Sequence, residues 1–234
     1  MKPPLHILHF KNQPIFDQLQ LEEALLRGDD RNFCIVNQGS PRAIVMGISG
    51  QPNQLLDIPR VQKDQIPVIK RFSGGGTVVV DENTLFVTFI LGKEQLDIPS
   101  FPEPILRWSS NLYESSWNIP QFQLRENDYC IGDVKCGGNA QYIRKERWLH
   151  HTSFLWDYSE KNMDYLLLPS KRPRYRGDRP HQEFLCRLKD HASNQDILIE
   201  QLKNELVKRF YISDLDPENL TPKEHRQSVH WVQI

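Results

Sequence analysis

Three consecutive glycines follow an arginine, a phenylalanine and a serine, and run directly into a β-branched stretch, in RFSGGGTVVVD (71–81). Glycine lets the backbone approach a ligand closely and adopt positive φ without a Cβ clash, so an anion could lie against main-chain N–H groups here. The Arg71 guanidinium could then engage a phosphate through two N–H donors. A tight hairpin is the alternative interpretation, and this segment by itself does not distinguish the two.

The glycine segment follows neither of the standard phosphate-binding motifs. A P-loop has the pattern G-x-x-x-x-G-K-[ST], and around Gly92-Lys93 both the first glycine and the final Ser/Thr are missing. A dinucleotide-binding turn has G-x-G-x-x-G at the start of a helix, whereas glycines 74–76 lead into a predicted strand. A nucleotide bound here would therefore depend on loop N–H groups and Arg71 rather than on a helix N-terminus.

A second cluster of glycines also carries a cation, in GDVKCGGNAQ (132–141). Lys135 lies just before Gly137 and Gly138, beside another stretch of accessible backbone. A lysine ammonium is a compact charge that can hold a carboxylate, a phosphate and a developing oxyanion. A solvated hairpin tip is the plain alternative, but two clusters that each pair glycines with a cation favour an anion site.

Four segments resemble the lipoate–protein ligase A family in their order and spacing. KRFSGGGTVVVDENTLFVTFI (70–90) is similar to the family signature R-x-S-G-G-G-x-V-x-x-D-x-x-N-L, and RENDYCIGDVKCGGNAQ (125–141) is similar to N-D...G-x-K-x-x-G-x-A. QGSPRAIVMG (38–47) resembles the family's x-x-P-x-V-x-x-G strand, and LHHTSFL (149–155) resembles H-H-G-T-L-L. The resemblance therefore covers most of the chain.

Members of this family join lipoate or octanoate to AMP and then pass the acyl group to a lysine of a lipoyl domain. The resemblance implies ATP and Mg²⁺ as cofactors and lipoate as substrate. It implies lipoyl-domain proteins as partners, namely the E2 subunits of 2-oxoacid dehydrogenases and the H protein of glycine cleavage. Joining a carboxylate to a triphosphate brings two anions together, so the reaction needs cations and N–H donors in one place.

The motifs carry functional roles over to individual residues of this sequence. Lys135 is the expected catalytic residue, as the cation that holds the acyl carboxylate and later polarises the adenylate carbonyl. The expected nucleotide or acyl-adenylate contacts are Arg71, Ser73, Gly74, Gly75, Gly76, Thr77, Val78, Val79 and Lys135. The expected acyl-binding or supporting residues are Asn83, Asp128, Gly138, Ala140 and His151. No residue is assigned as a direct metal ligand.

Some of these assignments have structural alternatives. Asn83 and Asp128 could cap the loops that contain them, and His151 could be a hydrogen-bonded strand histidine without ligand contact. The acyl chain needs an apolar tunnel, which residues 85–91 and 138–140 could line, although these side chains would belong to the core in any case.

Three positions differ from the family pattern. Val80 stands where ligases often carry a histidine, DENTL (81–85) shifts the D-x-x-N-L spacing, and Thr152 replaces a glycine. We expect residues 1–234 to form a single catalytic domain without the small C-terminal domain of full-length bacterial ligases. The protein could then adenylate alone, require a separate accessory chain, or transfer an acyl group from a ready-made donor.

Two further features bear on alternative functions. The basic run KRPRYRGDRPH (171–181) could be a phosphate-binding lid, a docking surface for an acidic lipoyl domain, or a solvated loop. Cys136 could in principle carry an acyl group as a thioester, but RWLH (147–150) lacks the cysteine that octanoyl transferases of this chemistry place before the motif histidine. We therefore interpret Cys136 as a packing residue. A non-catalytic module that binds lipoyl domains is the alternative outside enzymes.

The composition sets limits on partners and compartment. With 29 basic and 30 acidic residues among 234, the formal net charge is −1, so no overall field attracts nucleic acid or a membrane. The four cysteines form no C-x-x-C pair, which argues against a zinc site and a disulfide framework. The N-terminus has no signal-peptide pattern, and no apolar run reaches the roughly 18 residues of a membrane span. We expect a soluble cytoplasmic protein.

Three helices and a series of short strands must position the candidate residues. Helices are predicted over 17–27, with a capping box at its start and Gly28 as its stop, and over 105–117 and 195–210. Residues 77–81 and 85–91 should form a β-hairpin whose second arm is buried on both faces. The other predicted strands are 43–47, 66–71, 128–132, 140–144 and 153–158. Together they predict an α+β fold with a mixed, mostly antiparallel sheet packed with helices.

Overall fold

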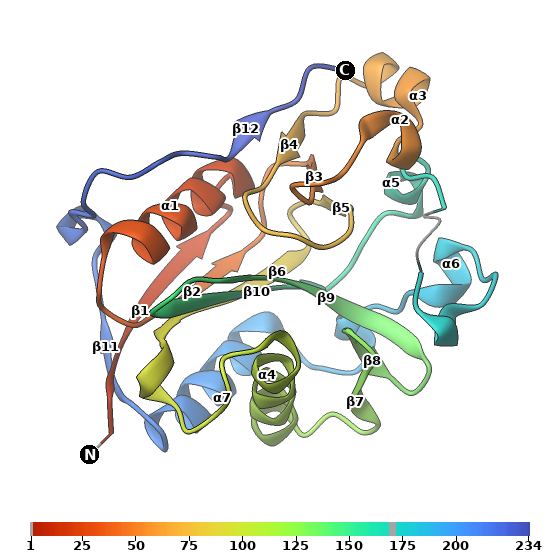
Figure 1. The fold of residues 1–234 in the computed structure, drawn as a ribbon. Helices are drawn as coiled ribbons and strands as arrows, with labels where there is room; N and C mark the ends of the chain where they lie inside the picture. The colour runs from red at the N-terminus through yellow and green to blue at the C-terminus, as the bar shows by residue number, and fades with distance from the viewer. Residues whose placement is uncertain (1, 169–171) are drawn as a thin grey trace.

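The strands of the chain form two sheets in the computed structural model, which describes residues 2–168 and 172–234 (Figure 1). The large sheet has eight strands in the order β11-β1-β2-β6-β10-β9-β8-β7, and the small sheet has four in the order β12-β4-β3-β5. The strands are β1 (Pro4–Lys11), β2 (Phe33–Gln38), β3 (Ala43–Met46), β4 (Val68–Lys70), β5 (Val78–Val80), β6 (Thr84–Gly92), β7 (Phe122–Arg125), β8 (Asp128–Ile131), β9 (Val134–Ile143), β10 (Arg147–Leu155), β11 (Tyr211–Asp214) and β12 (His230–Trp231). Among the strands of the described residues, only the pairs β1–β11, β1–β2 and β3–β4 are parallel, so the predicted α+β class with mostly antiparallel sheets is confirmed.

Three long helices cover the large sheet. Helix α1 (Ile15–Gly28) lies on one face, on the side of the small sheet, whereas α4 (Pro102–Trp117) and α7 (Gln195–Val207) lie together on the opposite face (Figure 1). The short α-helices are α2 (Pro52–Leu55), α3 (Ile58–Lys63), α5 (Glu160–Met163) and α6 (His181–Phe184). The 3-10 helices are η1 (Lys93–Gln95), η2 (Arg174–Arg176), η3 (Leu188–Asp190) and η4 (Pro217–Asn219).

Strand β6 contributes to two separate hydrophobic cores because its side chains alternate between the two faces of the sheet. Leu85, Val87 and Phe89 pack with α4 and α7, whereas Phe86 and Ile90 pack beneath α1 and the small sheet. The prediction that this strand is buried on both faces is therefore confirmed.

The predicted hairpin between residues 77–81 and 85–91 is wrong. Strand β5 pairs with β3 in the small sheet, and β6 pairs with β2 and β10 in the large sheet, so the chain crosses between sheets at residues 81–83. The Asp81 carboxylate accepts from the backbone N–H of Asn83, and the Asp81 N–H donates to the Thr84 hydroxyl. These local bonds form a turn, but they do not fix which strands pair on either side of it.

Helix α1 begins two residues before the predicted start. Its N-cap is Pro14, which makes no side-chain capping bond, and Asp17 lies in the first turn, so the predicted capping box is wrong. Gly28 ends the helix as predicted, and a Cβ there would lie 2.5 Å from the Lys223 carbonyl oxygen. This glycine is thus needed for a tertiary contact as well as for helix termination.

The other predicted elements have counterparts in the structure with shifted ends. Helices 105–117 and 195–210 correspond to α4 and α7, and each of the five short predicted strands overlaps an observed one. Strands β1, β2, β7, β11 and β12 are present without having been predicted. In the described part of the chain, no helix has both the length and the apolar character required to cross a membrane. The four cysteines are unpaired, and all but Cys186 are buried.

We expect the protein to lose stability in mild acid because His150 of β10 is buried. Gln141 Nε2 lies 3.0 Å from His150 Nδ1, and the Tyr129 hydroxyl lies 2.7 Å from Nε2. Burial lowers the pKa of His150 to about 3. In the unfolded chain the pKa of this histidine is about 6.5, so between pH 6.5 and 3 only the unfolded chain takes up the proton. The contribution of His150 to the free energy of unfolding is therefore fully present above pH 6.5 and is lost as pH falls towards 3, at about 1.4 kcal/mol per pH unit.

Urea unfolding at pH 7.5 and 5.5 measures this effect. We expect the free energy of unfolding of the wild type to fall by about 1.4 kcal/mol more than that of His150→Gln between these pH values. Equal losses in the two proteins would contradict a buried neutral His150.

Candidate functional site

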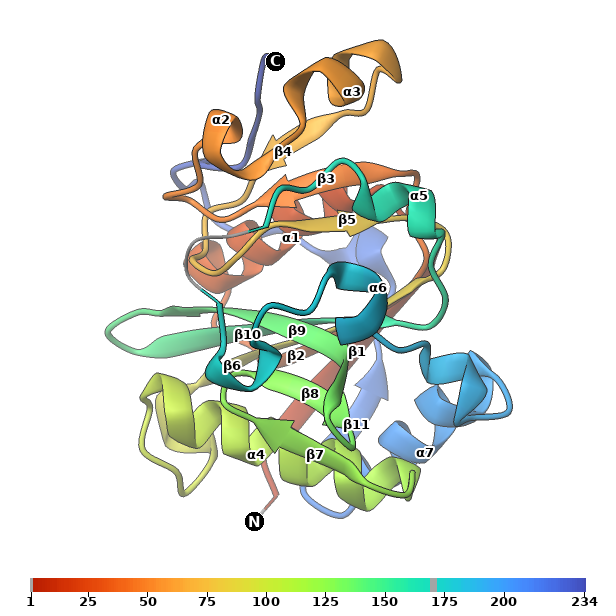
Figure 2. The same cartoon turned by 90° about the vertical axis from the view of Figure 1, so that its right-hand side faces the viewer.

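A cavity of about 290 Å³ lies between strand β5 of the small sheet and strands β9 and β10 of the large sheet. Figure 2 shows α6 between β9 and α5, and all three elements contribute residues to the lining of the cavity. The lining residues are Leu55, Gly76, Thr77, Val78, Val79, Val80, Thr84, Asp128, Lys135, Gly138, Ser153, Leu155, Met163, Leu166, Leu167, Pro173, Arg176, His181, Phe184 and Leu185. The cavity thus has apolar walls and a small group of charged side chains, as ligand sites usually do.

Lys135 and Asp128 form an ion pair in the wall of the cavity. Lys135 Nζ lies 2.7 Å from Asp128 Oδ1, and the two side chains are 23% and 12% exposed. A Cβ on Gly138 would lie 3.2 Å from Lys135 Nζ, so glycine at this position leaves room for the ammonium. An ammonium has three N–H donors, so Lys135 can bind Asp128 and still donate to a ligand.

The glycine loop, residues 74–76, has no side chains to cover its backbone, and the structural reason for glycine differs from one position to the next. Gly75 has φ +99°, a conformation that residues with a Cβ rarely adopt. A Cβ on Gly74 or Gly76 would meet no atom of the described chain within 4 Å, so these two glycines face open space. The loop also packs closely on Gly47, where a Cβ would lie 2.2 Å from the Gly75 carbonyl oxygen. The fold therefore requires glycine at 75 and 47, whereas bare backbone at 74 and 76 fits a ligand lying against the loop.

Arg71 braces this loop from inside the protein. Its Nη2 donates to the carbonyl oxygens of Gly74 and Gly76 at 2.7 and 2.9 Å, and its Nε also donates to Gly74 at 3.1 Å. The residue is 5% exposed, and burial lowers its pKa to about 10, so it stays charged at neutral pH. Arg71 does not line the cavity. Its predicted contact with phosphate stays a prediction, and the observed contacts give it a role in shaping the loop.

Two polar atoms in the cavity wall have no hydrogen-bond partner among the described residues. They are Thr77 Oγ1 and Arg176 Nη2, both buried. A buried polar group without a partner costs about 1–3 kcal/mol, so both groups call for a hydrogen-bond partner, which bound water or a ligand can supply. Arg176 is 5% exposed and its guanidinium lies over the Phe184 ring, 4.6 Å from the centroid.

His181 completes the polar end of the cavity. Burial lowers its pKa to about 4, and the cations Arg176 and Lys135 add to this effect. At neutral pH the imidazole is therefore uncharged, and it can donate or accept one hydrogen bond without adding a third positive charge.

The cavity gathers only some of the residues expected from the sequence. Those lining it are Gly76, Thr77, Val78, Val79, Asp128, Lys135 and Gly138, and those outside it are Arg71, Ser73, Gly74, Gly75, Asn83, Ala140 and His151. Residues 85–91 do not line it either, because the strand is enclosed by the two cores. The apolar wall comes instead from side chains such as Leu155, Met163 and Leu166.

His151 belongs to a buried network under α1. Its Nδ1 lies 2.9 Å from Glu22 Oε1, and the Thr88 hydroxyl donates to the same oxygen at 2.7 Å. Gln18 Nε2 donates to Glu22 Oε1 at 2.8 Å. These contacts fit the alternative interpretation, in which His151 is a hydrogen-bonded strand histidine without ligand contact.

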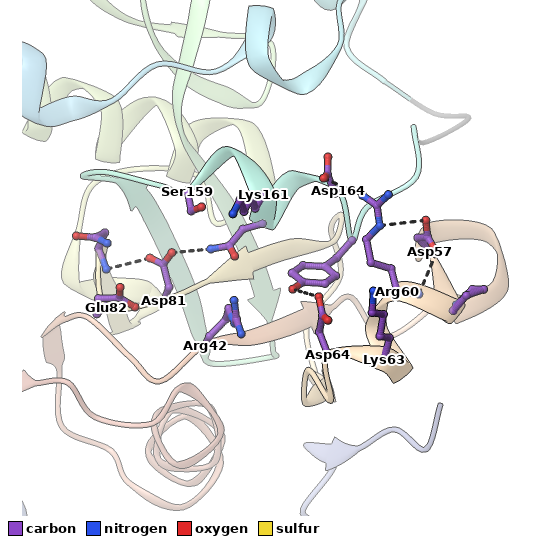
Figure 3. A pocket seen from close by; sticks show the side chains of 14 residues that line it. Arg42, Asp57, Arg60, Lys63, Asp64, Asp81, Glu82, Ser159, Lys161 and Asp164 are labelled. Atoms are coloured by element: carbon purple, nitrogen blue, oxygen red, sulfur yellow. Dashed lines mark hydrogen bonds and ion pairs between the residues drawn. The ribbon is translucent and has the colours of Figure 1, made fainter.

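Asn83 lines a different and larger hollow of about 1060 Å³. Figure 3 shows the charged side chains of this hollow, among them Asp57, Arg60 and Asp164. Its acidic side chains are largely paired within the protein: Asp57 and Asp164 contact Arg60, and Asp81 accepts from Asn162 at 2.8 Å. In the described chain, the hollow holds neither the glycine loop nor Lys135. We therefore place the candidate site in the smaller cavity.

Cys136 does not resemble a catalytic nucleophile. Its side chain is fully buried in the core, and its Sγ donates to the Tyr129 carbonyl oxygen at 3.4 Å. Burial raises the pKa of this thiol well above its usual value, so thiolate is scarce at neutral pH. The interpretation of Cys136 as a packing residue fits this geometry.

Arg176 and His181 are site residues that the sequence analysis did not single out. Both belong to the basic run 171–181, in which Lys171 lies outside the described residues. A run of cations indicates an anion site, but it does not show which member faces inward. Arg176 is buried in the cavity wall, whereas Arg172 pairs with Asp178 at the surface.

Comparison with known proteins gives the family to which this fold belongs. The chain belongs to the family of the lipoyl protein ligase A/B catalytic domain, which matches residues 14–211. It is 31% identical over 261 residues to a Plasmodium falciparum protein named "Inactive lipoate--protein ligase 2", covering 85% of this chain. The chain spans between 34% and 68% of the length of several curated relatives.

Solved structures show the same fold. A lipoate-protein ligase A bound with ATP superposes with a TM-score of 0.73 at 17% identity, covering 93% of this chain and 91% of that one. The bi-partite lipoate protein ligase of Thermoplasma acidophilum, described with its E2 lipoyl domain, gives a TM-score of 0.73 at 19% identity, covering 93% and 89% of the two chains.

Proposed function

We propose that this chain activates lipoate or octanoate with ATP to the acyl-adenylate and transfers the acyl group to a lysine of a lipoyl domain. The observation that carries the proposal is the convergence of Gly76, the Lys135–Asp128 pair and the unpartnered Thr77 and Arg176 on one cavity. Family membership and the ATP-bound neighbour support it. We further propose that residues 2–234 act as one catalytic unit.

The cavity has the size of an acyl chain rather than of a complete acyl-adenylate. Its volume of 290 Å³ is at the lower end of ligand sites, which range over about 300–1,000 Å³. In our proposal the acyl tail contacts Leu155, Met163 and Leu166, and the nucleotide lies over the open faces of Gly74 and Gly76. The acyl carbonyl is then placed at the polar end, near Lys135.

The polar groups have separate tasks in this proposal. Lys135 donates to the acyl carboxylate and then to the oxyanion that develops when the acceptor lysine attacks the carbonyl. The Thr77 hydroxyl and Arg176 Nη2 donate to oxygens of the phosphate, which satisfies both buried groups. Among the described residues, no group of three His, Cys, Asp or Glu side chains could hold a metal ion, and no step of this proposal is routed through Mg²⁺.

A module that binds lipoyl domains without catalysis is the second candidate. The name of the P. falciparum relative calls that protein inactive, and this chain is 31% identical to it. Retention of a lysine and a buried arginine in the cavity wall favours catalysis, because binding a lipoyl domain alone requires neither.

Intact-mass spectrometry of an acceptor domain separates the candidates. Purified protein is incubated with lipoate, ATP, Mg²⁺ and an apo lipoyl domain, and in parallel with synthetic lipoyl-AMP as the donor. We expect a gain of one lipoyl group in both reactions. Gain only with lipoyl-AMP would show a transferase that needs a partner for adenylation. No gain with either donor, together with binding of the domain, would favour the non-catalytic module.

Thr77→Val tests the unpartnered hydroxyl. Removing a buried hydroxyl that has no partner in the free protein should leave the free energy of unfolding unchanged or raise it by up to about 1 kcal/mol. The Kd for lipoyl-AMP, measured by calorimetry, should rise about tenfold because a hydrogen bond to a charged ligand is lost. Thr77→Ser, which retains the hydroxyl, is the matched control. An unchanged Kd in Thr77→Val would remove Thr77 from the site.

A further inference from the structure

The hydroxyl of Tyr175, a residue of η2, contacts the carboxylate that holds Lys135. It donates to Asp128 Oδ2 at 2.9 Å, while Asp128 Oδ1 lies 2.7 Å from Lys135 Nζ. One carboxylate oxygen of Asp128 therefore contacts the phenol, and the other contacts the ammonium. Neither the proposed function nor the family motifs give Tyr175 a role.

The remaining contacts of Tyr175 hold its ring in place. Its backbone N–H donates to Glu126 Oε1 at 3.2 Å, and its ring lies 5.3 Å from that of Phe184. The Arg125 guanidinium lies over the ring, 4.8 Å from the centroid. The residue is thus anchored from both strand β7 and helix α6, so its hydroxyl reaches Asp128 in a defined direction.

The phenol hydroxyl donates to the carboxylate. A phenol has a single proton, and a carboxylate oxygen accepts it. The Cys130 thiol lies 3.2 Å from the phenol oxygen and 3.8 Å from the Asp128 carbonyl oxygen, and it can donate to either. Burial raises the pKa of Tyr175, and it raises the pKa of Cys130 to about 11, so both groups keep their protons at neutral pH. The phenol is a permanent donor to Asp128.

This donor limits how Asp128 can bind Lys135. With Oδ2 occupied by the phenol, the ammonium is held by Oδ1 alone, and its other N–H groups are available to the cavity. Without the phenol, the carboxylate could turn and offer both oxygens to the ammonium, drawing it away from a ligand. The phenol also offsets part of the carboxylate charge that competes with a ligand for Lys135.

We propose that Tyr175 is a positioning residue that acts through Asp128 to keep the Lys135 ammonium directed at the ligand. The activity readout for this inference rests on the proposed function, whereas the labelling readout below does not. Tyr175→Phe removes the hydroxyl and keeps the ring contacts, so the fold should be retained.

The kinetic test uses lipoyl-AMP as donor and a lipoyl domain as acceptor. We expect Tyr175→Phe to lower kcat about tenfold, the effect of one hydrogen bond to a charged group, and to leave KM for the lipoyl domain unchanged. In an Asp128→Asn background the same substitution should have no further effect, because the two residues act in one chain of contacts. Cys130→Ala removes the other partner of the hydroxyl and should change kcat less than twofold. Additive losses of Tyr175→Phe and Asp128→Asn would overturn the proposal.

Reactivity of Lys135 provides a readout that does not depend on catalysis. The protein is treated briefly with acetic anhydride, and acetylation of Lys135 is quantified by peptide mass spectrometry relative to the exposed Lys145. We expect Tyr175→Phe to slow acetylation of Lys135 several-fold, and to have no effect when Asp128 is Asn. An unchanged rate would overturn the role of Tyr175. A wild-type protein that transfers no acyl group would instead overturn the proposed function.

Discussion

Lys135→Met should abolish acyl transfer while leaving the protein folded. The ammonium lies beside the bare backbone of β9, because a Cβ on Gly138 would be 3.2 Å from Lys135 Nζ. In the proposed reaction it stabilises charge that develops only in the transition state. Removing one such donor typically costs about 100- to 1,000-fold in rate, so we expect a loss of at least about 100-fold with either ATP and lipoate or lipoyl-AMP. Methionine has a similar length and fits the partly buried site. Intact-mass assays give the rate, and thermal unfolding monitors the fold.

Two variants control this result. Lys161→Met removes a lysine from the larger hollow and should leave transfer unchanged. Lys135→Arg retains the charge, but its planar guanidinium cannot replace a compact ammonium, so activity should stay low. Full activity of Lys135→Met would refute its assigned role and would move the search for the functional cation to Arg176.

Arg71→Lys should disable the glycine loop even though it conserves the charge. The guanidinium bridges the carbonyl oxygens of Gly74 and Gly76, and one ammonium cannot reproduce that set of donors. We expect the free energy of unfolding to fall by about 1–3 kcal/mol, as when buried acceptors lose their donors. Adenylation of lipoate should fall at least about tenfold, because the loop no longer presents its N–H groups at a fixed place.

The Arg71 result distinguishes a brace from a direct phosphate ligand. Hydrogen exchange at residues 72–77 should become faster in Arg71→Lys if the side chain shapes the loop. Arg42→Met, which removes an exposed arginine beside the same small sheet, is the matched control and should alter neither quantity. Unchanged exchange with a weaker affinity for ATP would instead support direct contact between Arg71 and phosphate.

Local sequence patterns predicted where the single helices lie, but they did not predict which strands pair with each other. Helices α4 and α7 follow from the spacing of their apolar residues, because a helix satisfies its backbone hydrogen bonds within one segment. The turn at residues 81–83 was also readable, but β5 and β6 join different sheets. A turn fixes only a local change of direction, and the two strands then pair with β3 and β2, which are distant in sequence.

The sequence by itself determined the family, and it predicted two parts of the candidate site. RFSGGG and the lysine of DVKCGG carry their signal in residue types and spacing, because bare backbone and a cation are needed whatever surrounds them. Only the tertiary structure decided that Arg71 turns inward to the loop carbonyls, that Arg176 is the inward-facing member of a basic run, and that Tyr175 meets Asp128. Side-chain direction in an irregular segment follows from which elements pack against it. Tyr175 and Asp128, for example, lie 47 positions apart in the chain, so no local pattern predicts their contact.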